Sequence, residues 1–165
     1  MCKINTYNTR AALLDSMERI ARREVKHYFA DWTEYDAPTV AGMEPGTSWI
    51  WITRDCGTHL FKADNFDAIR AVLECWKPAG VTARHLVIGP GACTLQKLDA
   101  AQLLEKCKRE LSTMKEYKIS YTAGTSPYWY NVSLYAYTPD EARELFEIRS
   151  GLCPYDVREI RVERV

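Results

Sequence analysis

The sequence predicts an α+β fold: an N-terminal helix, three successive strand–strand–helix units and a final strand, with helices packed on one face of an antiparallel sheet. A long amphipathic segment opens the chain, strand-like pairs joined by short turns follow, and each pair leads into a helical segment with a capping residue. Hairpins followed by helices are typical of antiparallel sheets with helices segregated to one face. We expect the 165 residues to form a single domain, residues 1–165.

Residues 9–32 carry the clearest helical pattern. Apolar side chains recur there every three or four residues, and charged side chains occupy the other side. Asn8 or Thr9 is suited to cap the start of this helix. The following segment, residues 36–48, is rich in turn-forming residues and predicts a loop.

The three strand–strand–helix units repeat at a spacing of about 34 residues, which is within the range of structural repeats. They cover about residues 48–76, 82–113 and 117–149, and a last strand covers about 157–164. Asp64 or Asn65 caps the first of their helices. Asp99 caps the second, and Thr138 with Glu141 predicts a capping box at the third. A solenoid is disfavoured because the units are few and their side chains barely match.

The first hairpin turns at residues 55–57. A three-residue loop with Gly57 in the left-handed conformation fits the two strand-like runs around it. This register sets Trp51 opposite Phe61, so that apolar residues face each other.

Cys56 and His59 in the same hairpin raise a catalytic alternative, in which a small cysteine-dependent enzyme uses Cys56 as nucleophile and His59 as base. The turn places Cys56 at a hairpin tip, where no helix N-terminus activates the thiol. We therefore expect no catalytic residue and a protein that is not an enzyme.

The sequence predicts neither a metal site nor a cofactor. The six cysteines are scattered without a C-x-x-C pair, and there are three histidines in all. His27 and Asp31 lie four positions apart, but no second histidine is near them. The segment 89–94, GPGACT, lacks the Lys-Ser or Lys-Thr of a phosphate loop, and Pro90 removes one backbone donor. A hairpin turn explains it better.

Charge and hydropathy narrow the class of partner. Lysine plus arginine equals aspartate plus glutamate, at 22 each, so no net field attracts nucleic acid or an anionic membrane. No run of about 18 apolar residues and no signal-like opening are present. We expect a soluble, cytoplasmic protein with reduced thiols. A nucleic-acid-binding module that uses the basic positions of the first helix is a further alternative, although we do not expect nucleic acid as the sole partner.

Aromatic residues concentrate in the third hairpin. Tyr128 and Tyr130 are expected on one face of a strand, with Trp129 and Tyr135 on the other. A strand with rings on both faces cannot hide all of them in a one-sided core. Exposed tyrosine and tryptophan are good anchors of protein interfaces, and no lysine or arginine lies between Thr122 and Asp140 to favour nucleic acid. We expect these four residues to bind a protein partner.

The C-terminal third resembles small accessory proteins of phages and conjugative plasmids. Thr138, Asp140, Glu141 and Ala142 carry the likeness, which covers about 30 residues and reflects a capped helix followed by a charged strand. The resemblance implies a mobile-element protein, a group that includes inhibitors of host defence. The expected function is thus a non-enzymatic inhibitor or adaptor that binds a host protein or protein complex, such as a defence system.

Overall fold

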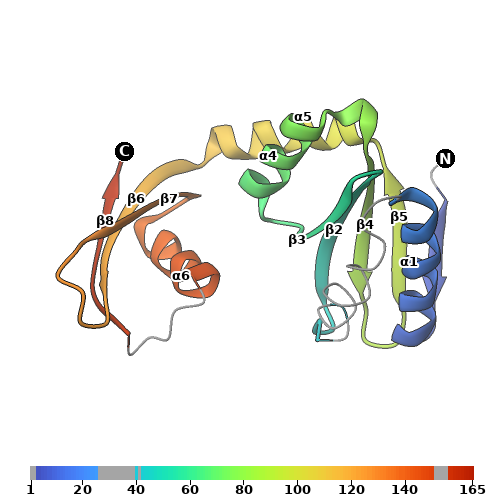
Figure 1. Cartoon of the computed structure of the whole chain (residues 1–165), viewed down its shortest axis with the longest axis horizontal. Helices are drawn as coiled ribbons and strands as arrows, with labels where there is room; N and C mark the ends of the chain where they lie inside the picture. The colour runs from blue at the N-terminus through green and yellow to red at the C-terminus, as the bar shows by residue number, and fades with distance from the viewer. Residues whose placement is uncertain (1–2, 26–39, 41, 151–155) are drawn as a thin grey trace. The chain divides into compact units, whose positions relative to one another are not determined.

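The computed structural model describes residues 3–25, 40, 42–150 and 156–165 (Figure 1). The α+β class and the alternation of hairpins and helices are confirmed. The elements are β1 (Ile4–Tyr7), α1 (Arg10–Glu24), β2 (Thr47–Arg54), β3 (Gly57–Lys62), α4 (Phe66–Trp76), the 3-10 helix η2 (Pro78–Gly80), β4 (Thr82–Ile88), β5 (Cys93–Leu98), α5 (Ala100–Thr113), β6 (Lys115–Ala123), β7 (Tyr130–Ala136), α6 (Pro139–Ser150) and β8 (Val157–Arg164).

The strands form two antiparallel sheets where one was expected. The first has the order β1-β5-β4-β2-β3, and the second has the order β7-β6-β8. The chain divides into two compact units, Met1–Cys107 (unit 1) and Lys108–Val165 (unit 2), and each sheet belongs to one of them. Strand β8 pairs with β6, while β1, which the sequence analysis missed, pairs with β5. The single domain expected over residues 1–165 stays a prediction.

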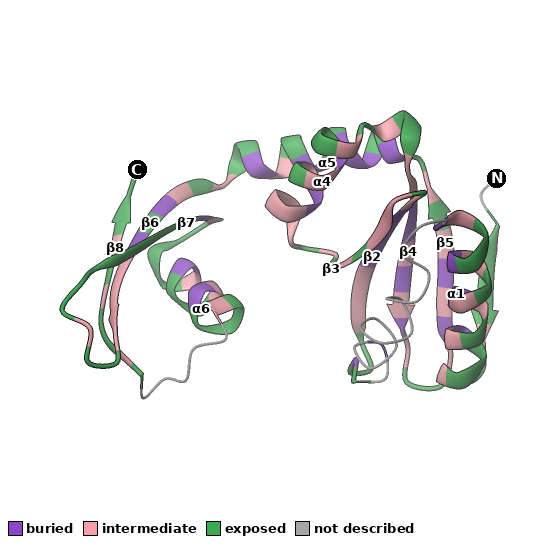
Figure 2. Ribbon diagram, in the orientation of Figure 1, coloured by how far each residue is buried: buried purple, intermediate pink, exposed green. Residues whose placement is uncertain are grey.

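Helices cover both faces of the five-stranded sheet, which corrects the expectation of one covered face. Helix α1 packs on one face through Leu13, Met17 and Ala21. Helices α4 and α5 pack on the other, where Ile50 and Ile52 are buried. The physical reason lies in β2, whose residues 50–53 are all buried (Figure 2). A strand that is apolar on both faces needs cover on both.

The three-stranded sheet follows the one-sided pattern that was expected. Helix α6 packs on one face through Ala142 and Phe146, against Tyr117, Ile119 and Leu134. The alternate residues of the same strands form the other face, which is polar. This polar face consists of Glu116, Lys118, Ser120 and Thr122 from β6, Asn131, Ser133 and Tyr135 from β7, and Glu159, Arg161 and Glu163 from β8. The hydroxyl of Thr138 caps α6 as expected by accepting the N–H of Glu141, whereas the carboxylate of Glu141 accepts the N–H of Tyr137, one residue before the position used in a capping box.

The first helix is shorter than the predicted 9–32. It begins after Thr9, whose hydroxyl accepts the N–H of Ala12, and it ends at Glu24, with Val25 already extended. Valine, histidine, tyrosine and phenylalanine, which occupy four of the five positions from Val25 to Phe29, have low helix propensity. Residues 26–32 lie outside the described residues, as does the pair His27 and Asp31.

The first hairpin forms between the expected strands but in a different register. Residues 55 and 56 make a two-residue turn, and Gly57 is the first residue of β3, paired with Arg54 and without a positive φ. Trp51 therefore lies opposite Leu60, not Phe61. A one-residue shift exchanges the faces of a strand. Here it directs Phe61 toward the core under α4 and leaves Leu60 beside Trp51.

A buried ion pair attaches the end of α1 to the sheet. The guanidinium of Arg84, in β4, donates to both carboxylate oxygens of Glu24, at 2.8 and 2.6 Å. The hydroxyl of Thr53 donates to the same carboxylate, and the guanidinium lies 5.3 Å from the ring centre of Trp51. Arg84 and Thr53 are both buried, so the network compensates for polar groups taken from water.

Replacing Arg84 tests this network. Arg84→Met should destabilise the fold by about 2 kcal/mol or more, because it leaves the Glu24 carboxylate without its main partner. Urea unfolding at neutral pH measures the loss. Arg23→Met is the matched control: Arg23 is exposed and lies 3.9 Å from the same carboxylate, so its removal should cost about 0.5 kcal/mol or less.

The effect of Arg84→Met should depend on pH. Burial alone raises the pKa of Glu24, but the hydrogen bonds from Arg84 and Thr53 and the charges of Arg84 and Arg23 outweigh burial and lower that pKa below 4.5. The pair therefore stabilises the fold above the pKa of unfolded glutamate, and this contribution is lost as pH falls through the lower folded pKa. The wild-type and Arg84→Met stabilities should converge in acid. If the difference in unfolding free energy between the two proteins stays constant with pH, the loss comes from packing of the aliphatic part of Arg84 and not from its charge.

Candidate functional site

The third hairpin leaves its aromatic residues exposed. Tyr128 is 72% exposed, Trp129 38% and Tyr130 44%, while Tyr135 is half-buried. Tyr128 and Trp129 precede β7, and Tyr130 and Tyr135 lie within it. We call these four residues the aromatic hairpin. Figure 2 shows β7 as exposed along most of its length.

Trp129 forms a cation–π contact that the sequence did not indicate. The guanidinium carbon of Arg161, in β8, lies 4.3 Å from the ring centre of Trp129. Arg161 belongs to the polar face of the sheet, which places the tryptophan on that face. The contact fixes the indole while both side chains keep solvent-accessible surface. Paired tryptophan and arginine are frequent in the centres of protein interfaces.

Tyr130 lies on the opposite face, as the alternation predicted. Its ring centre is 5.5 Å from that of Tyr121, and Tyr121 in turn lies 4.8 Å from Phe146 of α6. Tyr117 and Ile119 do not extend the exposed surface. Both residues are buried under α6, because they share the covered face of β6.

Strand β7 is an edge strand without charge. Within the described part of the chain, it pairs with β6 and with no other strand. Its sequence, YNVSLYA, contains no charged residue and no proline, whereas the opposite edge, β8, alternates charged side chains. Charges and prolines are the usual protection of an edge against pairing with another chain. The outer edge of β7 lacks that protection.

The structure does not pair Cys56 with His59. The imidazole of His59 stacks 5.5 Å from the ring of Phe61 and lies 4.7 Å from that of Trp76, and burial lowers the pKa of His59. Cys56 is half-buried in the turn, and no hydrogen bond joins it to His59 among the residues that the structure describes. The geometry thus provides no base for this thiol.

Neither the helical thiols nor the glycine loop forms a reactive centre with His59. Cys107 is buried, whereas Cys75 is exposed on the outer side of α4. The loop 89–92 closes the hairpin of β4 and β5 with a hydrogen bond from the N–H of Gly89 to the carbonyl of Ala92, at 2.9 Å. In the described ranges, no group of three histidine, cysteine, aspartate or glutamate side chains is placed to hold a metal ion.

The basic positions of α1 are partly neutralised. Arg22 forms a salt bridge with Glu18 at 2.6 Å, and Arg23 lies 3.9 Å from Glu24. The nucleic-acid alternative relied on this helix, and these contacts lower its free positive charge.

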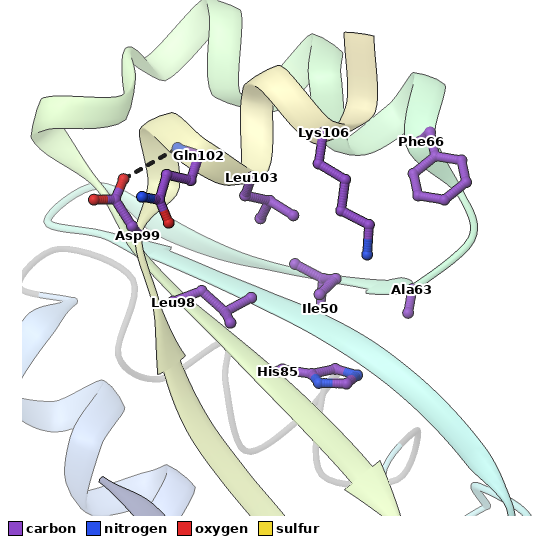
Figure 3. Close-up of a pocket in the computed structure, with 9 residues that line it drawn as sticks. All are labelled: Ile50, Ala63, Phe66, His85, Leu98, Asp99, Gln102, Leu103 and Lys106. Atoms are coloured by element: carbon purple, nitrogen blue, oxygen red, sulfur yellow. Dashed lines mark hydrogen bonds between the residues drawn. The ribbon is translucent and has the colours of Figure 1, made fainter. Parts of the chain in front are cut away.

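A pocket of about 230 Å³ opens in unit 1 between the sheet, α5 and the start of α4. Figure 3 shows the nine residues that line it: Ile50, Ala63, Phe66, His85, Leu98, Asp99, Gln102, Leu103 and Lys106. Burial lowers the pKa of His85, and the positive charge of Lys106 lowers it further.

The pocket lies where the helical cover of the sheet ends. On this face, Ile50 and Ile52 are buried under α4 and α5, but the strands β5 and β1 carry Gln96 and the exposed Ile4. His85 lies between these two regions, since it pairs with Ile50 on one side and Gln96 on the other. The pocket therefore lies at the border between the covered and the uncovered part of this face, with His85 in its lining.

No protein-family model matches the chain, and no curated protein or solved structure does so either. Among the described residues, no helix is both long and apolar enough to span a bilayer. The site is therefore interpreted from its own residues.

The thiol chemistry can be tested directly. Because His59 is held by Phe61 and Trp76, iodoacetamide should alkylate Cys56 no faster than the exposed Cys75, as followed by peptide mass spectrometry. His59→Phe should leave the rate at Cys56 unchanged. A fast reaction at Cys56 that His59→Phe abolishes would establish the dyad and favour the enzyme.

Proposed function

We propose that this chain is a non-enzymatic protein-interaction protein that binds its partner through the aromatic hairpin. The observation that carries the proposal is the exposure of Tyr128, Trp129 and Tyr130 beside an uncharged edge strand. Tyrosine and tryptophan bury a large area at a small entropic cost, which makes them common interface anchors. The arginine that stacks on Trp129 orders this ring before binding, which lowers the cost further.

The mode of contact that fits best is strand addition at β7. A partner segment in extended conformation forms main-chain hydrogen bonds with the free edge, and its side chains alternate between the two faces. On the face where α6 packs, the segment meets Tyr130 and Val132, which α6 leaves exposed. On the polar face it meets Trp129 with Arg161. The two faces of the sheet therefore favour different side chains in the partner segment.

The nature of the partner rests on the C-terminal resemblance alone. Thr138 and Glu141, which carry part of the likeness, cap the start of α6, so these two residues have a local structural role. The implied partner is a host protein complex, such as a defence system, with this chain as a mobile-element inhibitor or adaptor. Cys56, Cys75, Cys93 and Cys107 are free thiols, which is consistent with action in the reducing cytoplasm.

Trp129→Ala should weaken partner binding by about 2 kcal/mol or more, because it removes the central ring and the support of Arg161. Immobilised wild-type protein and variants are compared for what they retain from a bacterial lysate, and the retained protein is then titrated. Ile148→Ala is the control, since Ile148 is an apolar residue on α6 that is 68% exposed. Equal retention by all three proteins would exclude the aromatic hairpin as the contact surface.

Val132→Lys tests strand addition at β7 separately from binding by the side chains of the aromatic hairpin. A lysine at this edge position opposes pairing with another strand but is easily solvated in the free protein, because Val132 is 39% exposed. We expect loss of the retained partner with little change in the urea unfolding midpoint. Ile148→Lys introduces the same charge on α6 and should retain the partner. Binding that survives Val132→Lys but not Trp129→Ala would replace strand addition by contact through the polar face.

A further inference from the structure

In unit 1, one side of α5 faces the sheet across the pocket. Gln102 and Leu103 come three and four residues after Asp99, and Lys106 comes four and three residues after them, so all four lie along one side of the helix. Asp99 is engaged in capping, since its carboxylate accepts the N–H of Gln102 at 3.1 Å. Figure 3 shows the aliphatic chain of Lys106 running down toward the sheet, with its ammonium on the side of Phe66 and Ala63.

Lys106 and His85 both line this pocket and are its two basic groups. Among the described residues, neither the Lys106 ammonium nor the His85 imidazole forms a hydrogen bond or an ion pair. The ammonium is close enough to His85 to disfavour its protonation. An anion placed between these groups would be attracted by the ammonium and would accept a hydrogen bond from either side chain.

Most of the other lining residues are apolar. They are Ile50, Ala63, Phe66, Leu98 and Leu103, and the volume is below the range of drug-sized sites, about 300 Å³ and above. The pocket therefore has room for one ring or a short branched chain. Asp99 and Gln102 complete the lining, and the carboxylate of Asp99 repels a dianion more strongly than a monoanion. The charges of the lining therefore favour a single negative charge.

We propose that this pocket binds a small monocarboxylate with an apolar body, such as an aryl-alkyl carboxylate, whose carboxylate lies between Lys106 and His85. The apolar body contacts Phe66, Leu98 and Leu103. This site belongs to unit 1 and is independent of the aromatic hairpin, which belongs to unit 2.

The probe is 3-phenylpropionate, with the uncharged 3-phenylpropionamide and the dianionic phenyl phosphate as comparisons. Binding is followed by NMR titration of the full chain with each probe. From the size of the ligand we expect a Kd on the order of 1 mM for the carboxylate. The amide and phenyl phosphate should bind at least tenfold more weakly. Equal affinity for carboxylate and amide, or tighter binding of phenyl phosphate, would overturn the proposal.

Lys106→Met should weaken 3-phenylpropionate at least tenfold. Lys97→Met is the matched control, because Lys97 is exposed and pairs with Arg84 in the register that faces α1, on the other side of the sheet. The ring proton signals of His85 provide a second measurement. Saturation with the carboxylate should raise the pKa of His85, and so should Lys106→Met in the free protein. If 3-phenylpropionate binds without changing the pKa of His85, it binds elsewhere on the protein, which would contradict the proposed site.

Discussion

The ion pair between Glu24 and Arg84 is the constraint on which the arrangement of unit 1 depends. Apolar contacts alone tolerate sliding of a helix along a sheet, because one methyl group substitutes for another. A buried guanidinium does not, since its desolvation is offset only by a partner in the right geometry. Arg84 lies in β4, with strands paired on both sides, and its hydrogen bonds are directed to the last residue of α1. A shift of α1 by one turn would leave Arg84 unpaired beneath the helix.

Helix α1 covers this face of the sheet, and the pocket lies on the other face. There α4 and α5 cover the part built from β2 and β3, and their cover ends near β5. His85 stands at that border, which explains how an imidazole comes to share a cavity with Phe66 and Leu98. In a fully covered apolar face, the same histidine would be costly without a partner. The pocket is a consequence of a sheet that is wider than its two helices.

The sequence predicted the hairpins, the class and most of the helix caps, because these features depend on neighbours in the chain, but Asn65 forms no side-chain cap at α4. Asp99 and Thr138 cap as expected, since a cap needs only residues three positions away. It did not predict that β8 joins β6 while β1 joins β5, because strand partners are chosen by packing across long separations. For the same reason it missed Arg161 beside Trp129. The register of the first hairpin was wrong because a two-residue and a three-residue turn both fit the residues 54–58.

The exposed edge strand and the small core of unit 2 both follow from the small size of this unit. Its core rests on one helix and three strands, and so short a unit buries a smaller fraction of its surface than a larger domain does. Tyr130 and Val132 are on the covered face but remain exposed, whereas Leu134 and Ala136 on the same strand are buried. A strand added along β7 would cover the first pair as α6 covers the second. The partner segment would then complete the core as well as the sheet, so that binding and the stability of unit 2 would be thermodynamically linked.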